Sequence, residues 1–299
     1  MLDKTVVFSF DKTGFQRHKK NFSEDLSNKD LSGKRTLVTG GTSGIGGAVA
    51  KKLSKHGSIV DVTGRNHQKG ELFEEDNVNS VFYNLDMSDW DGIDAFCRQS
   101  LSYDFVVLNA GGMPDSLIEN KFNVEHQCAS QLIGHYYLIH CLNQNGCLIE
   151  NARIIWVSSG GMYLKKLDLK SLFQNKRYEK VSTYANVKRA QVTLSQELSK
   201  QELWEKTKMF SMHPGWVKTE GLSNSLPGFS KIMRKRLRRI DEGMDTILWL
   251  LLTKEPLISG GFYFDRKIVS TYLSKNYNPS LEERTELLNI IDNYINKIS

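Results

Sequence analysis

The sequence has little cysteine and no repeats, and these absences exclude several classes of protein. Its 299 residues contain four cysteines, whose spacing fits neither a disulfide framework nor a metal site: Cys97, Cys128, Cys141 and Cys147. We therefore expect reduced thiols, an intracellular protein and no bound metal. No internal repeat or low-complexity segment occurs. A secreted disulfide scaffold and a repeat protein are both excluded.

The sequence also lacks a long apolar run. Residues 6–8 are apolar, but the run is short and follows Asp3 and Lys4, so no signal peptide is predicted. The longest apolar run, residues 246–252, falls well short of the roughly 20 residues that cross a bilayer. We interpret that run as part of a buried helix. A cytoplasmic location is expected.

The composition is that of an ordinary globular protein. Hydrophobic residues make up 39% of the chain and charged residues 25%. The length suffices for one large α/β domain with a well-buried core. The chain has 40 basic and 34 acidic residues, a formal net charge of +6. This small excess suits an anionic cofactor and does not indicate a nucleic acid partner.

A glycine-rich turn stands between a strand pattern and a helix pattern. The turn reads Thr39-Gly40-Gly41-Thr42-Ser43-Gly44-Ile45-Gly46, and a helical pattern continues from Gly47. Glycine permits positive φ and close approach of a pyrophosphate, and a helix N-terminus offers free N–H groups to phosphates. A plain tight connection is the alternative. The flanking strand and helix favour a dinucleotide site.

Strand and helix patterns alternate after residue 34. This predicts an α/β fold of the Rossmann type, a doubly wound parallel sheet of about seven strands with helices on both faces in a single domain. The candidate strands are 35–39, 58–63, 78–84, 105–109, 154–158, 209–213 and 261–264, and the clearest helices are 125–142, 182–206 and 241–252. We divide the chain into a basic and aromatic arm (1–33), an NAD(P)-binding domain (34–275) and a C-terminal helical tail (276–299).

Two basic segments each permit two interpretations. The arm carries four phenylalanines among its charges, and it either packs on the domain surface or makes a weak contact with an anionic membrane surface. Residues 231–239 are strongly basic, with apolar residues at roughly helical spacing. They predict an amphipathic helix, whose basic face is either solvated or a docking surface for an acidic partner, lipid or substrate.

Three further elements follow in the order that hydride transfer requires. A predicted strand ends at Ser159, Tyr184 and Lys188 lie four residues apart on a predicted helix, and another strand ends at Pro214-Gly215. Carbonyl reduction needs a proton on oxygen, and a lysine ammonium and an oxidised nicotinamide both favour phenolate, which brings the tyrosine pKa from about 10 toward the working pH. A serine hydroxyl can orient the carbonyl. The tyrosine–lysine spacing alone means little, and its position after the other motifs makes it specific.

Together these motifs resemble the short-chain dehydrogenase/reductase family over roughly residues 33–270. The matching motifs are the glycine turn at 39–46, Asp86, Asn109-Ala110-Gly111, Ser159, Tyr184-x-x-x-Lys188 and Pro214-Gly215. Residues 157–162, 213–216 and 264–267 look like the dehydrogenase/reductase member 12 branch, which is similar to the retinol-dehydrogenase-like enzymes. The resemblance implies an NAD(P)-dependent oxidoreductase, a carbonyl reductase or alcohol dehydrogenase.

The resemblance also implies roles for single residues. Asp86 would meet the adenine edge, or alternatively cap the helix that begins near Asp89. Thr219 would meet the nicotinamide amide. The residues expected to bind the cofactor are Gly40, Thr42, Ser43, Gly44, Ile45, Gly46, Arg65, Asp86, Asn109, Ala110, Gly111, Tyr184, Lys188, Pro214, Gly215 and Thr219. The residues expected to be catalytic are Ser159, Tyr184, Lys188 and Gln131.

Gln131 departs from the family pattern. Residues 131–136 align with Asn-x-x-Gly-His-Phe, so Gln131 stands where the family has a fourth catalytic residue, an asparagine. That asparagine helps to hold a water linking the lysine to solvent. Glutamine keeps the amide and is one methylene longer. The alternative to an active enzyme is therefore a nucleotide-binding interaction protein or pseudoenzyme with weak or no turnover.

The second predicted strand indicates the cofactor. An NAD-selective site puts a carboxylate at its end, whereas this chain has Gly64 and Arg65, and a guanidinium suits a 2′-phosphate. Asp61 lies three residues too early to reach the ribose. Ser43 stands where many NADP-preferring relatives have a second basic residue. We expect a preference for NADP(H), with NAD(H) as the alternative. Arg65 could also be an exposed loop residue that binds no ligand.

Residues 219–240 are expected to cover the substrate, a small-molecule carbonyl or alcohol. Their apolar residues favour a lipophilic one, although they could equally form the core side of a helix: Leu222, Leu226, Phe229, Ile232 and Met233. The apolar faces of 125–142 and 182–206 either pair with a second copy in a homodimer or pack on the sheet.

Overall fold

Eight strands form one sheet in the computed structural model, which describes residues 6–174 and 177–298. They are β1 (Arg35–Thr39), β2 (Ile59–Gly64), β3 (Ser80–Asn84), β4 (Tyr103–Leu108), β5 (Leu148–Val157), β6 (Thr207–Met212), β7 (Phe262–Phe264) and β8 (Lys267–Ile268). The order is β3-β2-β1-β4-β5-β6-β7-β8. All neighbouring pairs are parallel except β7 and β8. The seven predicted strands are confirmed. The sequence did not predict β8, because two residues are too few to show the alternation of apolar and polar residues that indicates a strand.

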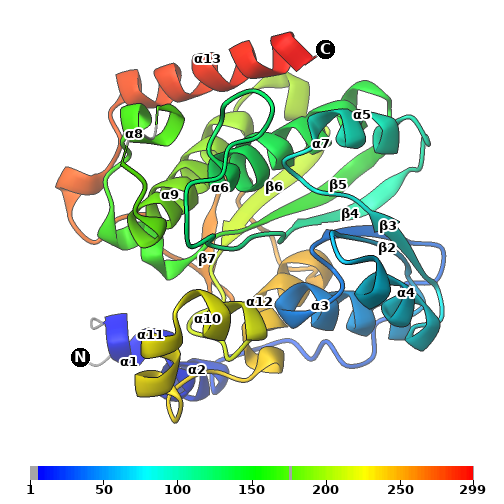
Figure 1. Cartoon of the computed structure of the whole chain (residues 1–299). Coiled ribbons are helices and arrows are strands. Elements are labelled where there is room, and N and C mark those ends of the chain that lie inside the picture. Colours follow the sequence, from blue (N-terminus) through cyan, green and yellow to red (C-terminus); the bar gives the residue numbers. More distant parts are fainter. Residues whose placement is uncertain (1–5, 175–176, 299) are drawn as a thin grey trace.

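Helices cover both faces of the sheet (Figure 1). On one face lie α3 (Gly44–Lys55), α4 (His67–Asp76) and α12 (Ile240–Leu252), and on the other lie α5 (Trp90–Cys97), α7 (His135–Gln144) and α9 (Lys180–Leu198). Successive strand residues serve opposite faces, because Leu37 and Val106 belong to one core cluster while Val38 and Val107 belong to the other. The fold is therefore the doubly wound, single-domain fold that the alternating pattern predicted. The apolar run at 246–252 lies in the buried part of α12.

Two of the predicted helices differ from the structure. The helix expected over 125–142 begins with α6 (His126–Cys128), passes through a π-helical turn, η2 (Ala129–Gly134), and continues as α7. A π-helical turn is invisible to periodicity and often marks a functional site. The helix expected over 182–206 ends at Leu198, because a 3-10 turn, η4 (Glu202–Trp204), leads into β6.

The C-terminal helix α13 (Leu281–Ile298) packs against α9. Its buried residues Leu287, Ile291 and Ile295 recur every fourth residue and share a core cluster with Leu194 and Leu198. The chain's own tail therefore covers part of the apolar face of α9. No helix in the described part of the chain is long and apolar enough to cross a membrane. The last residue of the tail, like the first five of the arm, lies outside the described residues.

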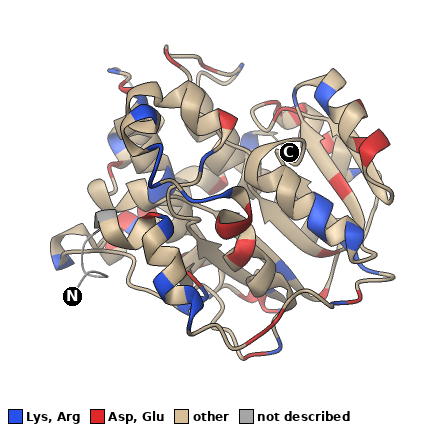
Figure 2. Cartoon of the chain, turned by 90° about the horizontal axis from the view of Figure 1, so that it is seen from below, with Lys and Arg blue, Asp and Glu red and all other residues tan. Residues whose placement is uncertain are grey.

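The N-terminal arm folds onto the domain. Its helices α1 (Val6–Phe10) and α2 (Lys12–Lys19) lie beside α10 (Glu220–Ser225) and α11 (Pro227–Met233) (Figure 1). Phe10 and Phe15 are buried, and the backbone N–H of Lys12 donates to the carbonyl of Arg236 at 2.9 Å. Basic and acidic residues are intermingled on the side of the molecule that Figure 2 shows.

The amphipathic helix predicted over 231–239 is wrong. The helix α11 ends at Met233, and Leu237 and Arg238 are buried. The guanidinium of Arg238 is 1% exposed and binds both carboxylate oxygens of Asp265 at 2.6 and 2.9 Å. The apolar spacing predicted a helix here, but the segment is extended at Arg238. Arg238 forms a β-bridge with Val217 and a buried ion pair with the distant Asp265.

Candidate active site

The sheet has its topological switch point, here called the crevice, where β1 and β4 end. These strands are neighbours, and the chain leaves them toward opposite sides of the sheet, which is the position where doubly wound folds bind ligands. The hydroxyl of Thr39 accepts hydrogen bonds from the backbone N–H groups of Asn109 and Ala110 at 2.9 and 3.0 Å. The Asn109 amide donates to the carbonyls of Thr39 and Gly40 at 3.1 and 3.2 Å. Asn109 and Ala110 are therefore fixed at the rim of the crevice.

A buried histidine completes this network. The Thr39 hydroxyl lies 3.0 Å from Nε2 of His135. The Thr39 hydroxyl proton has two acceptors within reach, Nε2 of His135 and the Val107 carbonyl at 3.4 Å. Burial lowers the pKa of His135 to about 3, and the charge of Lys188 lowers it further. Sequence reasoning gave His135 no role, since its partner lies 96 residues away.

The glycine turn fits a pyrophosphate. Gly44 has φ of +57° at the start of α3, and a Cβ on Gly46 would lie 2.4 Å from both the Gly40 carbonyl oxygen and the Asn109 amide nitrogen. Ser43 precedes α3 in an extended conformation and makes no capping bond, and the first turn of α3 has no acidic residue. The N–H groups and positive dipole end of this helix are therefore available to an anion. Residues 40–46 would hold the phosphates of a dinucleotide.

Arg65 and Asp86 lie together at the ends of β2 and β3. The guanidinium of Arg65 is 65% exposed, with Nη1 3.3 Å from His126 Nε2 and 3.8 Å from a carboxylate oxygen of Asp86. Asp86 accepts hydrogen bonds from Ser88, whereas Asp89 caps α5, so the alternative capping role for Asp86 is wrong. Exposed polar groups here would meet the adenosine end of a cofactor.

Asp61 lies inside the sheet, as its early position suggested. Its carboxylate binds Arg35 at 2.7 and 2.9 Å and accepts from the Tyr103 hydroxyl at 2.8 Å. Burial and the nearby carboxylate raise the pKa of Tyr103. The charge of Asp61 is therefore used within the fold and does not stand at the cofactor side of β2.

Ser159, Tyr184 and Lys188 are brought together beside the crevice. Ser159 follows β5 and caps a 3-10 turn, η3 (Gly160–Leu164), with Oγ accepting from the Gly161 N–H at 3.1 Å. Its side chain lies near enough to the Tyr184 phenol to lower the pKa of that phenol. The Lys188 ammonium lies 5.4 Å from the centre of the Tyr184 ring and donates to the carbonyl of Val157 at 3.0 Å. Strand β5 and helix α9 thus supply the whole group.

Burial controls the charges of this group. Burial raises the pKa of Tyr184, and the hydrogen bond from Ser159 lowers it only in part. Burial also lowers the pKa of Lys188 to about 7. The expectation that Lys188 lowers the tyrosine pKa is therefore not met by the chain alone. At neutral pH the phenol keeps its proton, which suits donation to a carbonyl oxygen.

Gln131 lies in the π-helical turn η2 and is fully buried. Its amide donates to the carbonyl of Gly112 at 2.7 Å, while its Oε1 has no hydrogen-bond partner. Gln191 of α9 donates to the backbone carbonyl of Gln131 at 2.5 Å. A buried amide oxygen without a partner is costly unless a water or ligand group satisfies it. Gln131 is thus tied to the loop after β4 and to the helix that carries Lys188.

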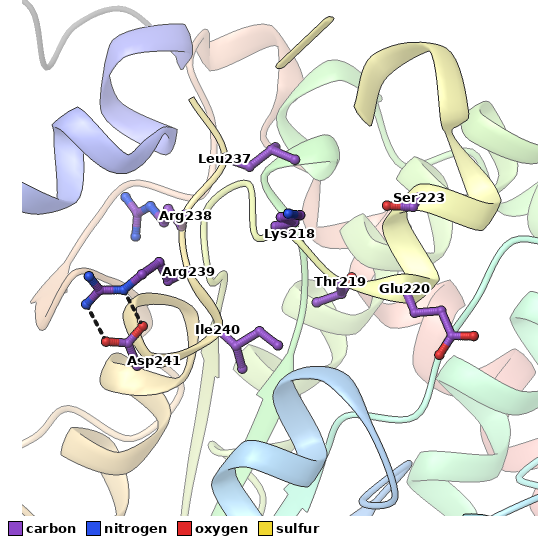
Figure 3. Close-up of a pocket in the computed structure, with 9 residues that line it drawn as sticks. All are labelled: Lys218, Thr219, Glu220, Ser223, Leu237, Arg238, Arg239, Ile240 and Asp241. Atoms are coloured by element: carbon purple, nitrogen blue, oxygen red, sulfur yellow. Dashed lines mark hydrogen bonds and ion pairs between the residues drawn. The ribbon is translucent and has the colours of Figure 1, made fainter. Parts of the chain in front are cut away.

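A hollow of about 620 Å³ lies between the start of α10 and the segment that leads into α12 (Figure 3). Thr219 lines it and caps α10 by accepting from the Leu222 N–H at 3.1 Å. A Cβ on Gly44 would lie 3.8 Å from the methyl carbon of Thr219, so Thr219 also lies beside the predicted phosphate site. The other lining residues are Lys218, Glu220, Ser223, Leu237, Arg238, Arg239, Ile240 and Asp241.

The expected substrate cover is built from α10 and α11. Neither helix contains a buried residue, and Ile232 is 83% exposed. Phe229 packs edge-on against Trp216 with ring centres 5.3 Å apart. Pro214 and Gly215 precede this region, and the Pro214 carbonyl accepts from Arg238 at 3.3 Å. The apolar residues of 219–240 are therefore not the core side of a buried helix.

The chain is similar to proteins of known class. A model of the NAD dependent epimerase/dehydratase family matches residues 36–253. Dehydrogenase/reductase SDR family member 12 of Bos taurus is 33% identical over 95% of this chain and 93% of its own length. Retinol dehydrogenase 11 of Mus musculus is 29% identical over 80% of each chain. The solved structure of BdcA in complex with NADPH has a TM-score of 0.61 at 20% identity and covers 78% of this chain and 93% of its own.

A dinucleotide crevice with a tyrosine and a lysine at its edge is the arrangement of an NAD(P)-dependent oxidoreductase. The chain belongs to the short-chain dehydrogenase/reductase family. A nicotinamide cofactor is accordingly its class of cofactor. The glycine turn, the uncapped start of α3 and the rim of β4 fit such a group.

The burial of Lys188 predicts a stability that rises with pH. The pKa of about 7 in the folded chain lies below the ordinary 10.5, so the unfolded chain binds more protons between these pH values. From pH 7 to pH 9 we expect the free energy of unfolding of the wild type to gain about 2 kcal/mol relative to Lys188→Met. Denaturant unfolding of both proteins at the two pH values measures this. A constant difference between them would show that Lys188 has an ordinary pKa.

Proposed function

We propose that the protein is an NADP(H)-dependent oxidoreductase that transfers a hydride between the nicotinamide and a lipophilic carbonyl or alcohol. The proposal rests on one observation: Ser159, Tyr184 and Lys188 converge from β5 and α9 at the edge of the dinucleotide crevice. When bound, the nicotinamide supplies or accepts the hydride. The chain's own residues orient the oxygen of the substrate and move its proton.

Each of the three residues has a distinct part in this proposal. The Ser159 hydroxyl, fixed by the Gly161 N–H, orients the carbonyl oxygen. Tyr184 donates its phenolic proton to that oxygen in reduction and accepts it in oxidation. Lys188, held on the Val157 carbonyl, carries a charge that titrates near neutral pH and places its ammonium over the tyrosine ring. It would also hold the ribose hydroxyls of the cofactor.

Arg65 supports a preference for NADP(H). Its guanidinium is exposed at the end of β2, where an NAD-selective site has a carboxylate, and Asp61 is occupied inside the sheet. A 2′-phosphate would accept charge-assisted hydrogen bonds from this guanidinium. Asp86 and His126 stand beside it and would bound the adenosine.

The apolar side chains of α10 and α11 support a lipophilic substrate. Leu222, Leu226 and Phe229 are half-buried on α10 and α11, with Trp216 packed on Phe229. The relatives include retinol dehydrogenases, whose named substrate is apolar. A panel of aliphatic and aromatic aldehydes and ketones with NADPH tests this preference against small polar carbonyls.

A second candidate function is a pseudoenzyme that binds nucleotide with little turnover. The bond from the Gln131 amide to the Gly112 carbonyl at 2.7 Å favours it, because it holds this side chain on the loop after β4, and no bond from Gln131 to Lys188 occurs among the contacts of the described residues. The proton relay that the family asparagine supports would then be weak.

Tyr184→Phe is expected to abolish turnover and to leave NADPH affinity within a few-fold. Loss of the proton donor should lower kcat at least about 100-fold, since general acid catalysis contributes that much. Steady-state assays and fluorescence titration with NADPH measure both quantities. Tyr178→Phe removes a hydroxyl that bonds the Pro114 carbonyl and serves as the matched control. Turnover near that of the wild type in Tyr184→Phe would end the assigned role.

Arg65→Ala is expected to weaken NADPH binding more than NADH binding. Loss of a charge-assisted bond to phosphate should raise the NADPH Kd about 10- to 100-fold. Arg98→Ala removes another exposed guanidinium, one paired with Asp94 on α5, and should change neither Kd. Calorimetric titration with the two cofactors measures the difference. Equal losses for NADPH and NADH would show that Arg65 does not meet the 2′-phosphate.

Gln131 decides between the two candidate functions. If its amide holds a relay water, Gln131→Ala should lower kcat while Gln131→Asn keeps or raises it, and the NADPH Kd should barely move in either. Gln127→Ala, which removes another buried amide one turn earlier, should lower the melting temperature without lowering kcat per folded molecule. The same outcome for Gln131→Ala would remove Gln131 from the site.

A further inference from the structure

The N-terminal arm reaches the catalytic serine. Phe10, at the end of α1, packs its ring against His213, Phe264 and Trp216, with ring centres 4.4, 5.2 and 6.0 Å apart. A Cβ on Gly160 would lie only 2.6 Å from Cε2 of Phe10, so the ring rests directly on the residue that follows Ser159. Phe10 therefore stands between the loop that leaves β5 and the loop that leaves β6.

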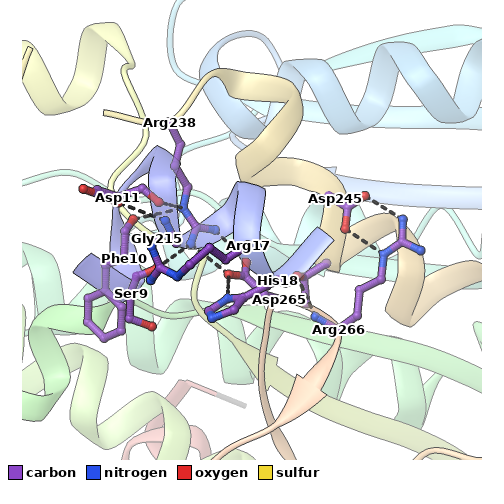
Figure 4. Close-up of polar contacts among 12 residues, drawn as sticks. Ser9, Phe10, Asp11, Arg17, His18, Gly215, Arg238, Asp245, Asp265 and Arg266 are labelled. Atoms are coloured by element: carbon purple, nitrogen blue, oxygen red, sulfur yellow. Dashed lines mark hydrogen bonds and ion pairs between the residues drawn. The ribbon is translucent and has the colours of Figure 1, made fainter. Parts of the chain in front are cut away.

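The backbone of the arm is bound into the same loops. The Phe10 carbonyl accepts from the Trp216 N–H at 2.9 Å. The buried guanidinium of Arg238 donates to the carbonyls of Ser9 and Phe10 at 3.0 and 2.9 Å (Figure 4). Its other bonds reach Asp265, and Nδ1 of His18, in the arm, lies 2.6 Å from that carboxylate. Charge and hydrogen bonding thus fix the arm at one place.

The ring of Phe10 has no freedom to leave Gly160. It is 6% exposed and belongs to a separate core cluster with Met162, Tyr163 and Phe264. Met162 and Tyr163 lie in η3, the turn whose first bond joins the Gly161 N–H to Ser159 Oγ. The position of the Ser159 hydroxyl therefore depends on a turn that Phe10 covers from outside.

We propose that Phe10 is a positioning residue for Ser159, so that residues 6–19 form an integral part of the active site. The proposal rests on the proposed function, because it assigns Phe10 to the reaction that Ser159 and Tyr184 support. The ring holds η3 against the end of β5 and keeps the serine hydroxyl on the phenol of Tyr184. Phe10 itself acts through this turn and has no place in proton transfer.

The first test removes the ring and compares it with another aromatic of the arm. Phe10→Ala should lower kcat about 10- to 100-fold, since a displacement of about 1 Å costs that much, while the NADPH Kd stays within about twofold. Phe10→Leu refills most of the space and should recover most of the activity. Phe22→Ala is the control, because Phe22 packs on Phe15 and Arg266. It should leave kcat per folded molecule unchanged.

The second test uses the close approach of the two residues. Gly160→Ala should lower kcat in the wild-type background, because the added methyl meets the ring at 2.6 Å. In the Phe10→Ala background the same change should lower kcat far less, which a double-mutant cycle measures as coupling. Unchanged kcat in folded Phe10→Ala, an equal loss in Phe22→Ala, or additive losses in the cycle would each overturn the proposal.

Hydrogen exchange separates this proposal from the proposed function. Phe10→Ala should speed exchange of backbone amides in residues 160–164, and Phe22→Ala should not. If the wild type reduces no carbonyl at all, the proposed function fails. The exchange measurement then still shows whether Phe10 holds the turn. Unchanged exchange in Phe10→Ala would overturn the positioning role whatever the activity.

Discussion

The arrangement of the candidate site depends on the hydroxyl of Thr39, which contacts the end of β4 and His135. Strands β1 and β4 separate at their carboxyl ends, so the N–H groups of Asn109 and Ala110 have no strand partner there. Buried N–H groups need acceptors, and the single oxygen of Thr39 accepts from both. The same oxygen lies 3.0 Å from Nε2 of His135, which joins the crevice to η2 and so to Gln131. The Thr39 side chain thereby connects the end of β1, residues 109–110 after β4 and helix α7, which begins at His135.

The buried lysine shows how the fold prepares chemistry at a cost in stability. Taking an ammonium out of water is unfavourable, and the carbonyl of Val157 offsets this only in part. The consequence is a pKa of about 7, near the pH at which a proton must move. The same burial raises the pKa of Tyr184. Helix α9 thus carries a tyrosine, Tyr184, that stays protonated at neutral pH, and a lysine, Lys188, that titrates near pH 7.

Arg238 joins the N-terminal arm to the loops that follow β6 and β7. A buried guanidinium is tolerated only when its charge and its N–H groups are all satisfied. Asp265 supplies the charge, and the carbonyls of Ser9, Phe10 and Pro214 supply acceptors. Four segments far apart in the sequence therefore meet at one side chain. The arm becomes part of the loop system around Ser159 through this residue.

The sequence by itself determined the seven parallel strands, the helices on both faces and the family, because local periodicity and the glycine turn are written in consecutive residues. It also supplied Ser159, Tyr184 and Lys188 as candidates. Only the tertiary structure decided the π-helical turn at Gln131, the neutral state of His135, the burial of Arg238 and the contact of Phe10 with Gly160. Each of these depends on a partner elsewhere in the chain or on desolvation. Neither leaves a periodic signal in the sequence, since both arise only after distant segments pack.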